Sequence, residues 1–188
     1  IDYTNVKLGN NAQLNHTAQS ADKNVVSDNV VKFTGSGATA NFGASAGVQG
    51  NYELTTKIDN GKANKVVFNN STVNLTLQDY TGSTEYRLSN SDLNLVEKGE
   101  AAATKDYTFT NLTTDNATLS FNVEIVDGST AGSKVLKTDT LTITNGSNNT
   151  KFNFGNIYIK GEENGNPDVY QTTKDVLSGA QFAGQPTD

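Results

Sequence analysis

Three groups of acidic residues are spaced closely enough to be considered for acid–base chemistry. They are Glu97 with Glu100, Asp127 with Asp139, and Glu162-Glu163 with Asp168. Hydrolysis of a glycosidic bond needs two carboxyl groups held on either side of that bond. These groups fall in predicted loops, the chain has no Trp, and Arg87 is its only arginine. We therefore predict that the protein is not an enzyme, and a polysaccharide-degrading enzyme is the less favoured alternative.

Metal-binding residues are also sparse. His16 is the only histidine and the chain has no cysteine, so a zinc site would have too few ligands. We predict His16 to be a solvated turn residue. Oxygen ligands at Asp127, Asp139 or the Asp115-Asn116 turn would suit Ca²⁺, but the sequence has neither a DxDxDG loop nor a GGxGxD repeat. No cofactor is predicted, and calcium is kept as an option.

The charge of the chain limits its partners. The formal net charge is −6, whereas nucleic acids and anionic membranes attract clusters of Lys and Arg. The sequence has no such cluster, so nucleic acid is not expected as a partner. No apolar run approaches the ~18–20 residues of a membrane-spanning helix.

The composition indicates an ordered, exported β protein. Hydrophobic residues make up 34% of the chain and charged residues 18%, and polar uncharged residues fill the difference, unlike in disordered chains. Apolar and polar residues alternate with period two, which is typical of strands with one face in water. The absence of cysteine favours a bacterial protein at the cell surface or outside the cell. Because Ile1 is not an initiator Met, we expect the chain to be a piece of a larger product.

A short pattern recurs between Phe68 and Phe154. It consists of an apolar residue, an Asn two residues later, and then an apolar-polar-apolar triplet. The lead asparagines of the four copies are Asn70, Asn90, Asn111 and Asn145. The first two copies are about 20 residues apart, as in β-solenoid repeats. If the copies stack about 4.8 Å apart, these side chains form a structural ladder in which each amide donates to the next.

The recurrence predicts an all-β fold, namely a segment of a right-handed parallel β-helix in which each coil lies one strand spacing beyond the last. The alternative is an antiparallel β-sandwich. The irregular spacing of residues 1–60 and the long insert between Asn111 and Asn145 favour that alternative.

Residues 1–160 are predicted to form one β-rich domain. Within it, residues 119–125 alternate most strongly, Asn60-Gly61 predicts a turn, and residues 79–85 predict a polar connection. Residues 161–188 predict a C-terminal helix or a linker, because an Asn-Pro start and a Gly end bracket a helical spacing of apolar residues.

Four segments near the end of the β region resemble a known family. They are residues 111–113 (NLT), 117–123 (ATLSFNV), 138–144 (TDTLTIT) and 151–154 (KFNF). This series is similar to the C-terminal stem of pertactin-type bacterial autotransporter passengers, although Thr140 stands where that family usually has Lys. The resemblance implies a right-handed parallel β-helix that aids folding of the secreted passenger and displays adhesive loops. It implies no catalytic residue.

We therefore expect a structural or adhesive protein of the bacterial surface, the passenger stem of an autotransporter-like adhesin. Its expected partners are a host or bacterial surface receptor or a glycan, and self-association is kept as an option. A pilin, an S-layer protein or a carbohydrate-binding module is the alternative that accompanies the β-sandwich.

Overall fold

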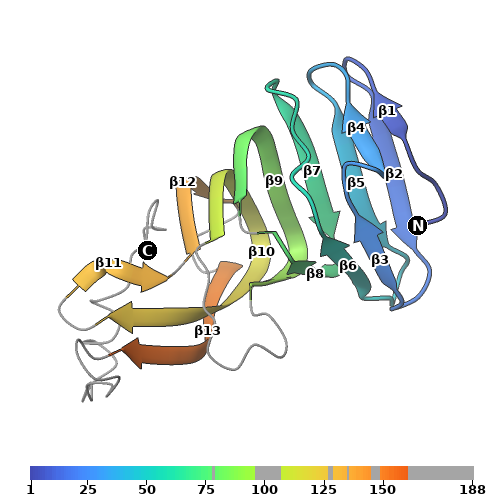
Figure 1. The fold of residues 1–188 in the computed structure, drawn as a ribbon. Coiled ribbons are helices and arrows are strands. Elements are labelled where there is room, and N and C mark those ends of the chain that lie inside the picture. Colours follow the sequence, from blue (N-terminus) through green and yellow to red (C-terminus); the bar gives the residue numbers. More distant parts are fainter. Residues whose placement is uncertain (78, 96–106, 127–128, 135, 145–148, 161–188) are drawn as a thin grey trace.

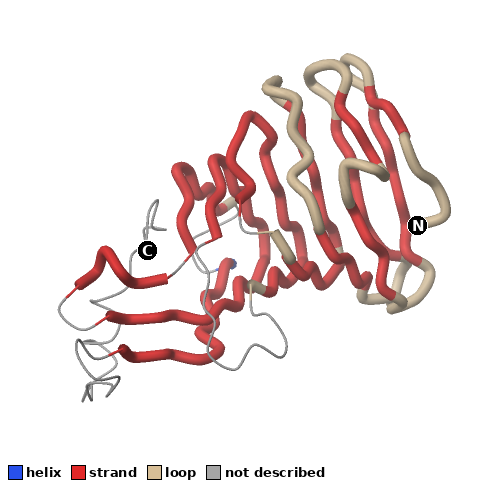
Figure 2. The backbone as a smooth tube through the Cα atoms, viewed as in Figure 1, coloured by secondary structure: helices blue, strands red, loops and turns tan. Residues whose placement is uncertain are grey.

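The computed structural model describes residues 1–77, 79–95, 107–126, 129–134, 136–144 and 149–160, and these form β-strands joined by turns and loops (Figures 1 and 2). The strands are β1 (Val6–Leu8), β2 (Gln13–Ala18), β3 (Lys23–Val26), β4 (Val31–Phe33), β5 (Thr39–Ala44), β6 (Gly50–Leu54), β7 (Asn64–Asn69), β8 (Ser71–Leu75), β9 (Asp79–Asn94), β10 (Tyr107–Val126), β11 (Ser129–Lys134), β12 (Leu136–Ile143) and β13 (Thr150–Lys160). No helix in the described part is long and apolar enough to cross a membrane. The predicted helix or linker at 161–188 lies outside the described residues.

The strands form a large curled sheet in which neighbouring strands run parallel (Figure 1). One side of the curl has the order β2, β5, β7, β9, β10, β12. The other side has the order β3, β6, β8, β9, β10, β13, so the long, bent strands β9 and β10 belong to both sides. A short parallel pair joins β1 to β4.

The predicted all-β fold with parallel strands is confirmed by this pairing. Among the described strands, the only antiparallel pair is β10 with β11. The antiparallel β-sandwich is therefore wrong as the architecture of this region.

The distance along the chain between neighbouring strands is not constant. It is 20 residues from Asn74 to Asn94, 26 from Asn15 to Asn41, and 33 from Ser120 to Asn153. The predicted 20-residue recurrence is thus one of several lengths. Since the sheet register continues across all of them, the extra residues are accommodated in the connections.

The core lies inside the curl, where alternate residues of each strand point. Two rows of inward residues follow the sheet register: Phe42, Phe68, Leu88 and Thr114 on one side, and Tyr52, Val73, Leu93 and Leu119 on the other. All of them are buried. The rings of Phe42 and Phe68 stack with centroids 5.6 Å apart, and burying one such side chain contributes about 1.5–3 kcal/mol.

Residues 79–85 are not a polar connection, because they form the first part of β9. Tyr80 is fully buried and stacks on Phe109 with 5.0 Å between ring centroids. Thr84 is also buried, and its hydroxyl donates to the Ile58 carbonyl, although the segment is mostly polar. The two other specific predictions are confirmed: residues 119–125 lie in β10, and Gly61 adopts the positive φ of a turn residue, 74°.

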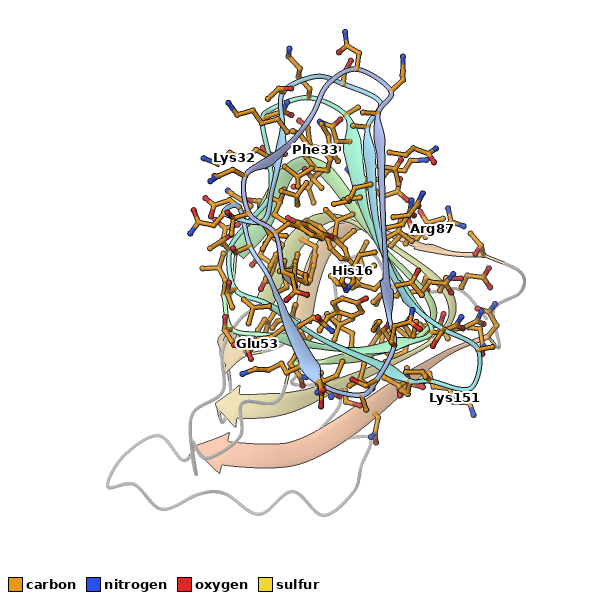
Figure 3. All side chains as sticks on the ribbon, turned by 90° about the vertical axis from the view of Figure 1, so that its right-hand side faces the viewer. His16, Lys32, Phe33, Glu53, Arg87 and Lys151 are labelled. Atoms are coloured by element: carbon orange, nitrogen blue, oxygen red, sulfur yellow. The ribbon has the colours of Figure 1, made fainter. Side chains whose placement is uncertain are left out.

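His16 is also placed differently from the prediction of a solvated turn residue. It lies in β2, in register with Phe42, and its half-buried ring points into the curl (Figure 3). Its centroid lies 6.3 Å from that of Phe42 and 5.9 Å from that of Tyr52, and Nδ1 lies 3.3 Å from the Tyr3 hydroxyl. Burial lowers the pKa of His16, with the chain's amino terminus adding to the effect and Asp2 opposing it. The isolated position of this histidine in the sequence did not indicate that it faces the core.

Candidate functional site

The carboxylates considered for catalysis lie almost entirely outside the described residues, so their mutual arrangement stays a prediction. Six of them lie outside the described residues: Glu97, Glu100, Asp127, Glu162, Glu163 and Asp168. Asp139 lies in β12, in a part where only the backbone is described. Elsewhere in the described ranges, no three His, Cys, Asp or Glu side chains gather as metal ligands.

A corner of the curled sheet is formed by asparagines in the left-handed conformation. Asn70, between β7 and β8, has φ 51°, and Asn90, at the bend of β9, has φ 49°. Asn116 has φ 52° at the equivalent bend of β10, and its Nδ2 donates to Oδ1 of Asn90 over 2.8 Å. Asn tolerates this conformation better than most residues. We call these three residues the Asn corner.

The Asn corner differs from the predicted ladder at Asn111. Asn111 lies in register with Glu85 and Thr140, whereas Asn116 contacts Asn90, so Asn111 is not stacked on Asn90. The corner position in that strand belongs to Asn116, which is followed by the small residue Ala117. Asn145 lies outside the described residues. Asp115 was considered above as a calcium ligand. Its Oδ1 accepts a hydrogen bond of 2.9 Å from Nδ2 of Asn149.

Buried hydroxyl groups lie directly beside the Asn corner. Ser71 and Ser91 each follow a corner asparagine and are buried. The Ser71 amide donates to Oγ of Ser91 over 3.1 Å, and Oγ of Ser91 donates to the Ser89 carbonyl over 2.8 Å. These bonds satisfy backbone groups that the bend removes from the sheet ladder. The hydroxyls therefore have a structural use and are not free nucleophiles.

A second row of asparagines runs along the outside of the sheet. Nδ2 of Asn74 donates to Oδ1 of Asn51 over 3.4 Å, and Nδ2 of Asn94 donates to Oδ1 of Asn74 over 3.2 Å. The row continues through Ser120 to Asn153, whose Nδ2 donates to the Ser120 hydroxyl over 3.4 Å. We call it the outer Asn row. Asn74, Asn94, Ser120 and Asn153 were visible in the sequence as the polar residues of the apolar-polar-apolar triplets, but that position alone did not indicate mutual hydrogen bonding. Asn51 precedes the first copy of the pattern.

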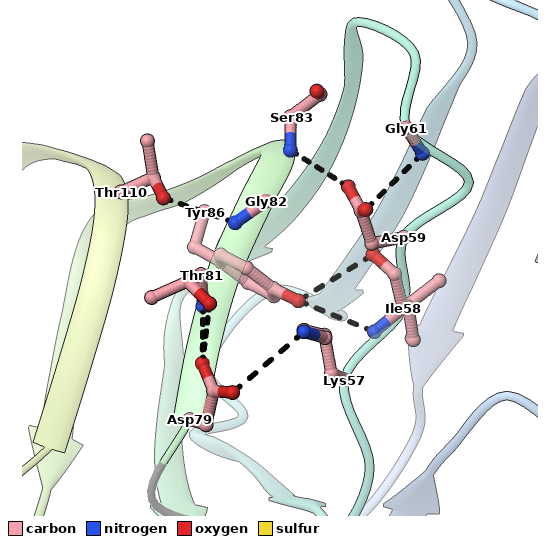
Figure 4. A network of polar contacts seen from close by, with 10 residues as sticks. All are labelled: Lys57, Ile58, Asp59, Gly61, Asp79, Thr81, Gly82, Ser83, Tyr86 and Thr110. Atoms are coloured by element: carbon pink, nitrogen blue, oxygen red, sulfur yellow. Dashed lines mark hydrogen bonds and ion pairs between the residues drawn. The ribbon is translucent and has the colours of Figure 1, made fainter.

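Asp59 is the centre of a polar cluster at another turn of the chain (Figure 4). Its Oδ1 accepts from the amides of Ser83 and Thr84, both at 2.9 Å, and its Oδ2 accepts from the Gly61 amide at 3.1 Å. Gly82 has φ 135°, and a Cβ there would come within 2.6 Å of Asp59 Cγ. Because backbone donors occupy both oxygens, this carboxylate closes a turn and is poorly placed as a general base.

The neighbouring Asp79 carboxylate is held by Thr81 and Lys57 (Figure 4). It accepts from the Thr81 hydroxyl and amide at 2.6 and 2.8 Å, and Lys57 Nζ lies 3.7 Å away. The hydrogen bonds from Thr81 lower the pKa of Asp79, and the charge of Lys57 contributes in the same direction. Asp79 is thus ionised at neutral pH and unsuited to act as a general acid.

A hollow of about 670 Å³ lies over the outward residues of β5, β7, β9, β10 and β12. We call it the outer groove. The residues that line it include Lys65, Glu85, Arg87, Asn111, Thr113 and Thr142. Figure 3 shows Arg87 on the outside of the curl, opposite in direction to His16. The sequence analysis noted Arg87 only as the single arginine and did not predict a binding surface around it.

Comparisons with protein-family models, with curated proteins and with solved structures give no match. The function must therefore be inferred from the fold and from the chemistry of these surfaces. They offer hydrogen-bonding groups in regular rows, which are suited to holding a fold together or to binding a polar partner.

Proposed function

We propose that this chain is a segment of a right-handed parallel β-helix and that it serves as a structural and adhesive stem of a bacterial surface or secreted protein. The observation that supports the coil is the register. Each strand on either side of the curl pairs with its counterpart from the next pass of the chain. The short β1–β4 pair supplies a third side at the first two passes.

The stem role is supported by the nature of the outer surface. Among the residues whose side-chain burial is described, Val25, which is 41% exposed, is the one exposed large hydrophobic residue. The outer Asn row and the outer groove offer regular hydrogen-bonding groups instead. The resemblance of residues 111–154 to the stem of pertactin-type passengers agrees with this role, and it carries no catalytic residue.

The coil can be tested with cysteine pairs, because the chain has no cysteine of its own. The double variant Asn74→Cys/Asn94→Cys joins residues that are in register, so we expect a disulfide to form on mild oxidation. The control Thr72→Cys/Asn94→Cys shifts one residue by two positions, beyond the Cα separation that a disulfide tolerates. Equal cross-linking of both pairs would contradict the register.

The adhesive role can be tested with beads coated with the folded chain. We expect them to adhere to cultured cells or extracellular matrix more than albumin-coated beads do. Soluble chain should compete with this adhesion. Adhesion no greater than that of albumin-coated beads, on all surfaces tested, would remove the adhesive role while leaving the coil intact.

A further inference from the structure

The outer groove combines two cations, one carboxylate and several neutral hydrogen-bonding groups on adjacent strands. The register places Lys65, Glu85 and Asn111 in one row across β7, β9 and β10. A second row, two residues further along the strands, contains Arg87 and Thr113, and it continues to Thr142 in β12. Neighbouring parallel strands lie about 4.8 Å apart, so these side chains surround one patch of surface.

The charged side chains of the groove form no ion pair within the described structure. The ion pairs between described residues are Lys23–Glu53 and Lys57–Asp79. Neither involves Lys65, Glu85 or Arg87. The groove centre therefore carries a local excess of one positive charge on a chain whose formal net charge is −6.

Arg87 can hold a bound carboxylate in a defined orientation. It is half-buried and lines the groove. A guanidinium binds a carboxylate through two parallel hydrogen bonds, a geometry that lysine lacks. The local positive charge and the planar donor together favour a ligand that carries a carboxylate.

The remaining groups favour a ligand rich in hydroxyls. Asn111 and Thr142 each donate and accept hydrogen bonds, and Glu85 accepts them. Thr113 also lines the groove but is buried. Peptides are commonly bound in apolar grooves, by addition to a sheet edge or, when acidic, by clusters of Arg, whereas the described lining of this groove is mainly polar and holds a single arginine. The groove lies over the outer face of β7, β9 and β10, which have neighbours on both sides, and it extends to β12, whose described partner is β10.

We propose that the outer groove binds an oligosaccharide that carries carboxylate groups. Arg87 holds a carboxylate, Lys65 adds long-range attraction, and the Thr, Asn and Glu side chains hydrogen-bond the sugar hydroxyls. This inference rests on the adhesive role proposed above and names the class of ligand for it.

The test is titration of the full chain, by calorimetry, with a hyaluronan hexasaccharide and with 3′-sialyllactose. The matched neutral ligands are the carboxyl-reduced hexasaccharide and lactose. We expect at least one acidic sugar to bind, with an affinity that falls as salt is added, and its neutral counterpart to bind at least about tenfold more weakly. Absence of binding to both acidic sugars, or equal binding of the neutral forms, would overturn the proposal.

Variants assign the binding to the groove. Arg87→Gln should weaken acidic-sugar binding by at least about tenfold and Arg87→Lys by less, because lysine keeps the charge but not the paired donors. Lys65→Gln, at an exposed position, should weaken it a few-fold. Lys32→Gln, on the outside of β4 and away from the groove, should have no effect (Figure 3). Unchanged binding by both Arg87→Gln and Lys65→Gln would overturn the assignment, and thermal unfolding checks that each variant is folded.

The bead assay separates this inference from the adhesive role. Adhesion that persists in Arg87→Gln, together with no sugar binding by the unmodified chain, would overturn the groove proposal and leave adhesion standing. Specific sugar binding without bead adhesion would overturn the adhesive role and leave the groove proposal standing.

Discussion

The N-terminal and central parts of the molecule turn the same corner of the sheet in different ways. In the first two passes the chain leaves one side of the curl and enters the other through loops, residues 19–22 and 45–49. In the next passes a single left-handed asparagine is sufficient, at Asn70, Asn90 and Asn116. The difference shows that a one-residue corner needs two conditions: a residue that tolerates positive φ, and a small residue after it that fits inside the bend.

The two types of corner meet at Gly50 and Ser71, which lie in register. A Cβ at Gly50 would come within 2.4 Å of Oγ of Ser71. The aromatic cluster of Phe42, Tyr52 and Phe68 spans the same junction, with centroid separations of 5.6 Å for each pair. This junction is where changes should separate the two parts most clearly.

The largest effect is expected from Phe68→Ala. Phe68 is buried and joins the rings of the loop-containing passes to the first Asn corner. Removing a core phenylalanine typically costs about 3–5 kcal/mol of unfolding free energy. Urea unfolding followed by tyrosine fluorescence would measure it. The control Val25→Ala, at an exposed position, should change stability little, and similar losses for the two variants would contradict this role of Phe68.

Gly50→Ala should cost about 1–3 kcal/mol, because the added methyl group overlaps the buried Ser71 hydroxyl. The matched control is Gly9→Ala, since a Cβ at Gly9 meets no atom within 4 Å. Thermal unfolding of both variants provides the comparison. If Gly50→Ala is as stable as Gly9→Ala, the bend has more room than the structure indicates.

Asn90→Ala should destabilise the corner by about 1–2 kcal/mol, the approximate cost of placing an ordinary residue in the left-handed conformation. Asn90→Gly should cost less, because glycine adopts this conformation readily, although the acceptor for Asn116 is lost. Chemical denaturation measures both. Because both variants lose the same side-chain acceptor, a glycine variant no more stable than the alanine variant would contradict the left-handed conformation of residue 90.

Acid should destabilise the first two passes of the chain more than the later ones, because His16 lies in the first. Its pKa is lowered in the folded state, so the folded chain favours the neutral ring, and the unfolded chain takes up a proton first as the pH falls below about 6.5. Folding stability associated with His16 is therefore full above that pH and is lost on acidification. We expect the difference in unfolding free energy between the unmodified chain and His16→Gln to shrink between pH 7.5 and 5.5. A constant difference over that range would contradict the burial of the ring. Hydrogen exchange should show the loosening in β2 and β5 before β9.

The smallest effect is expected in the outer Asn row. Asn74→Ala removes two exposed or half-exposed amide contacts and should cost about 0.5 kcal/mol or less, as for typical cross-strand polar pairs. Asn15→Ala removes the exposed Asn15–Asn41 contact. It measures the corresponding loss of unfolding free energy in the first two passes, whose corners are loops. Both values come from denaturation midpoints. A loss above about 1 kcal/mol in either would show that the exposed amides, rather than the core, hold the register.

Part of the corner could have been located from local sequence alone. Asn70-Ser71, Asn90-Ser91 and Asn116-Ala117 each pair an asparagine with a small residue. Asn111 is followed by Leu112, which is buried in a different row of the core, so it does not meet the second condition. The recurrence pattern selected Asn111 because it matched the preceding apolar residue and ignored the size of the following one.

The amino-acid sequence by itself determined the all-β class and the faces of the strands, because period-two alternation is a local property that survives any arrangement of the strands. It also predicted that Asn70 and Asn90 lie in neighbouring passes, which agrees with the register of Asn69 with Ser89 and of Thr72 with Asp92. The amide-to-amide bond between them stays a prediction. The tertiary structure decided which residues stack where the passes differ in length, since register across 26 or 33 residues depends on connections whose length the local pattern does not constrain. For the same reason only the fold brought His16 against the core rings and gathered Lys65, Glu85 and Arg87 with Thr113 and Thr142 into one groove.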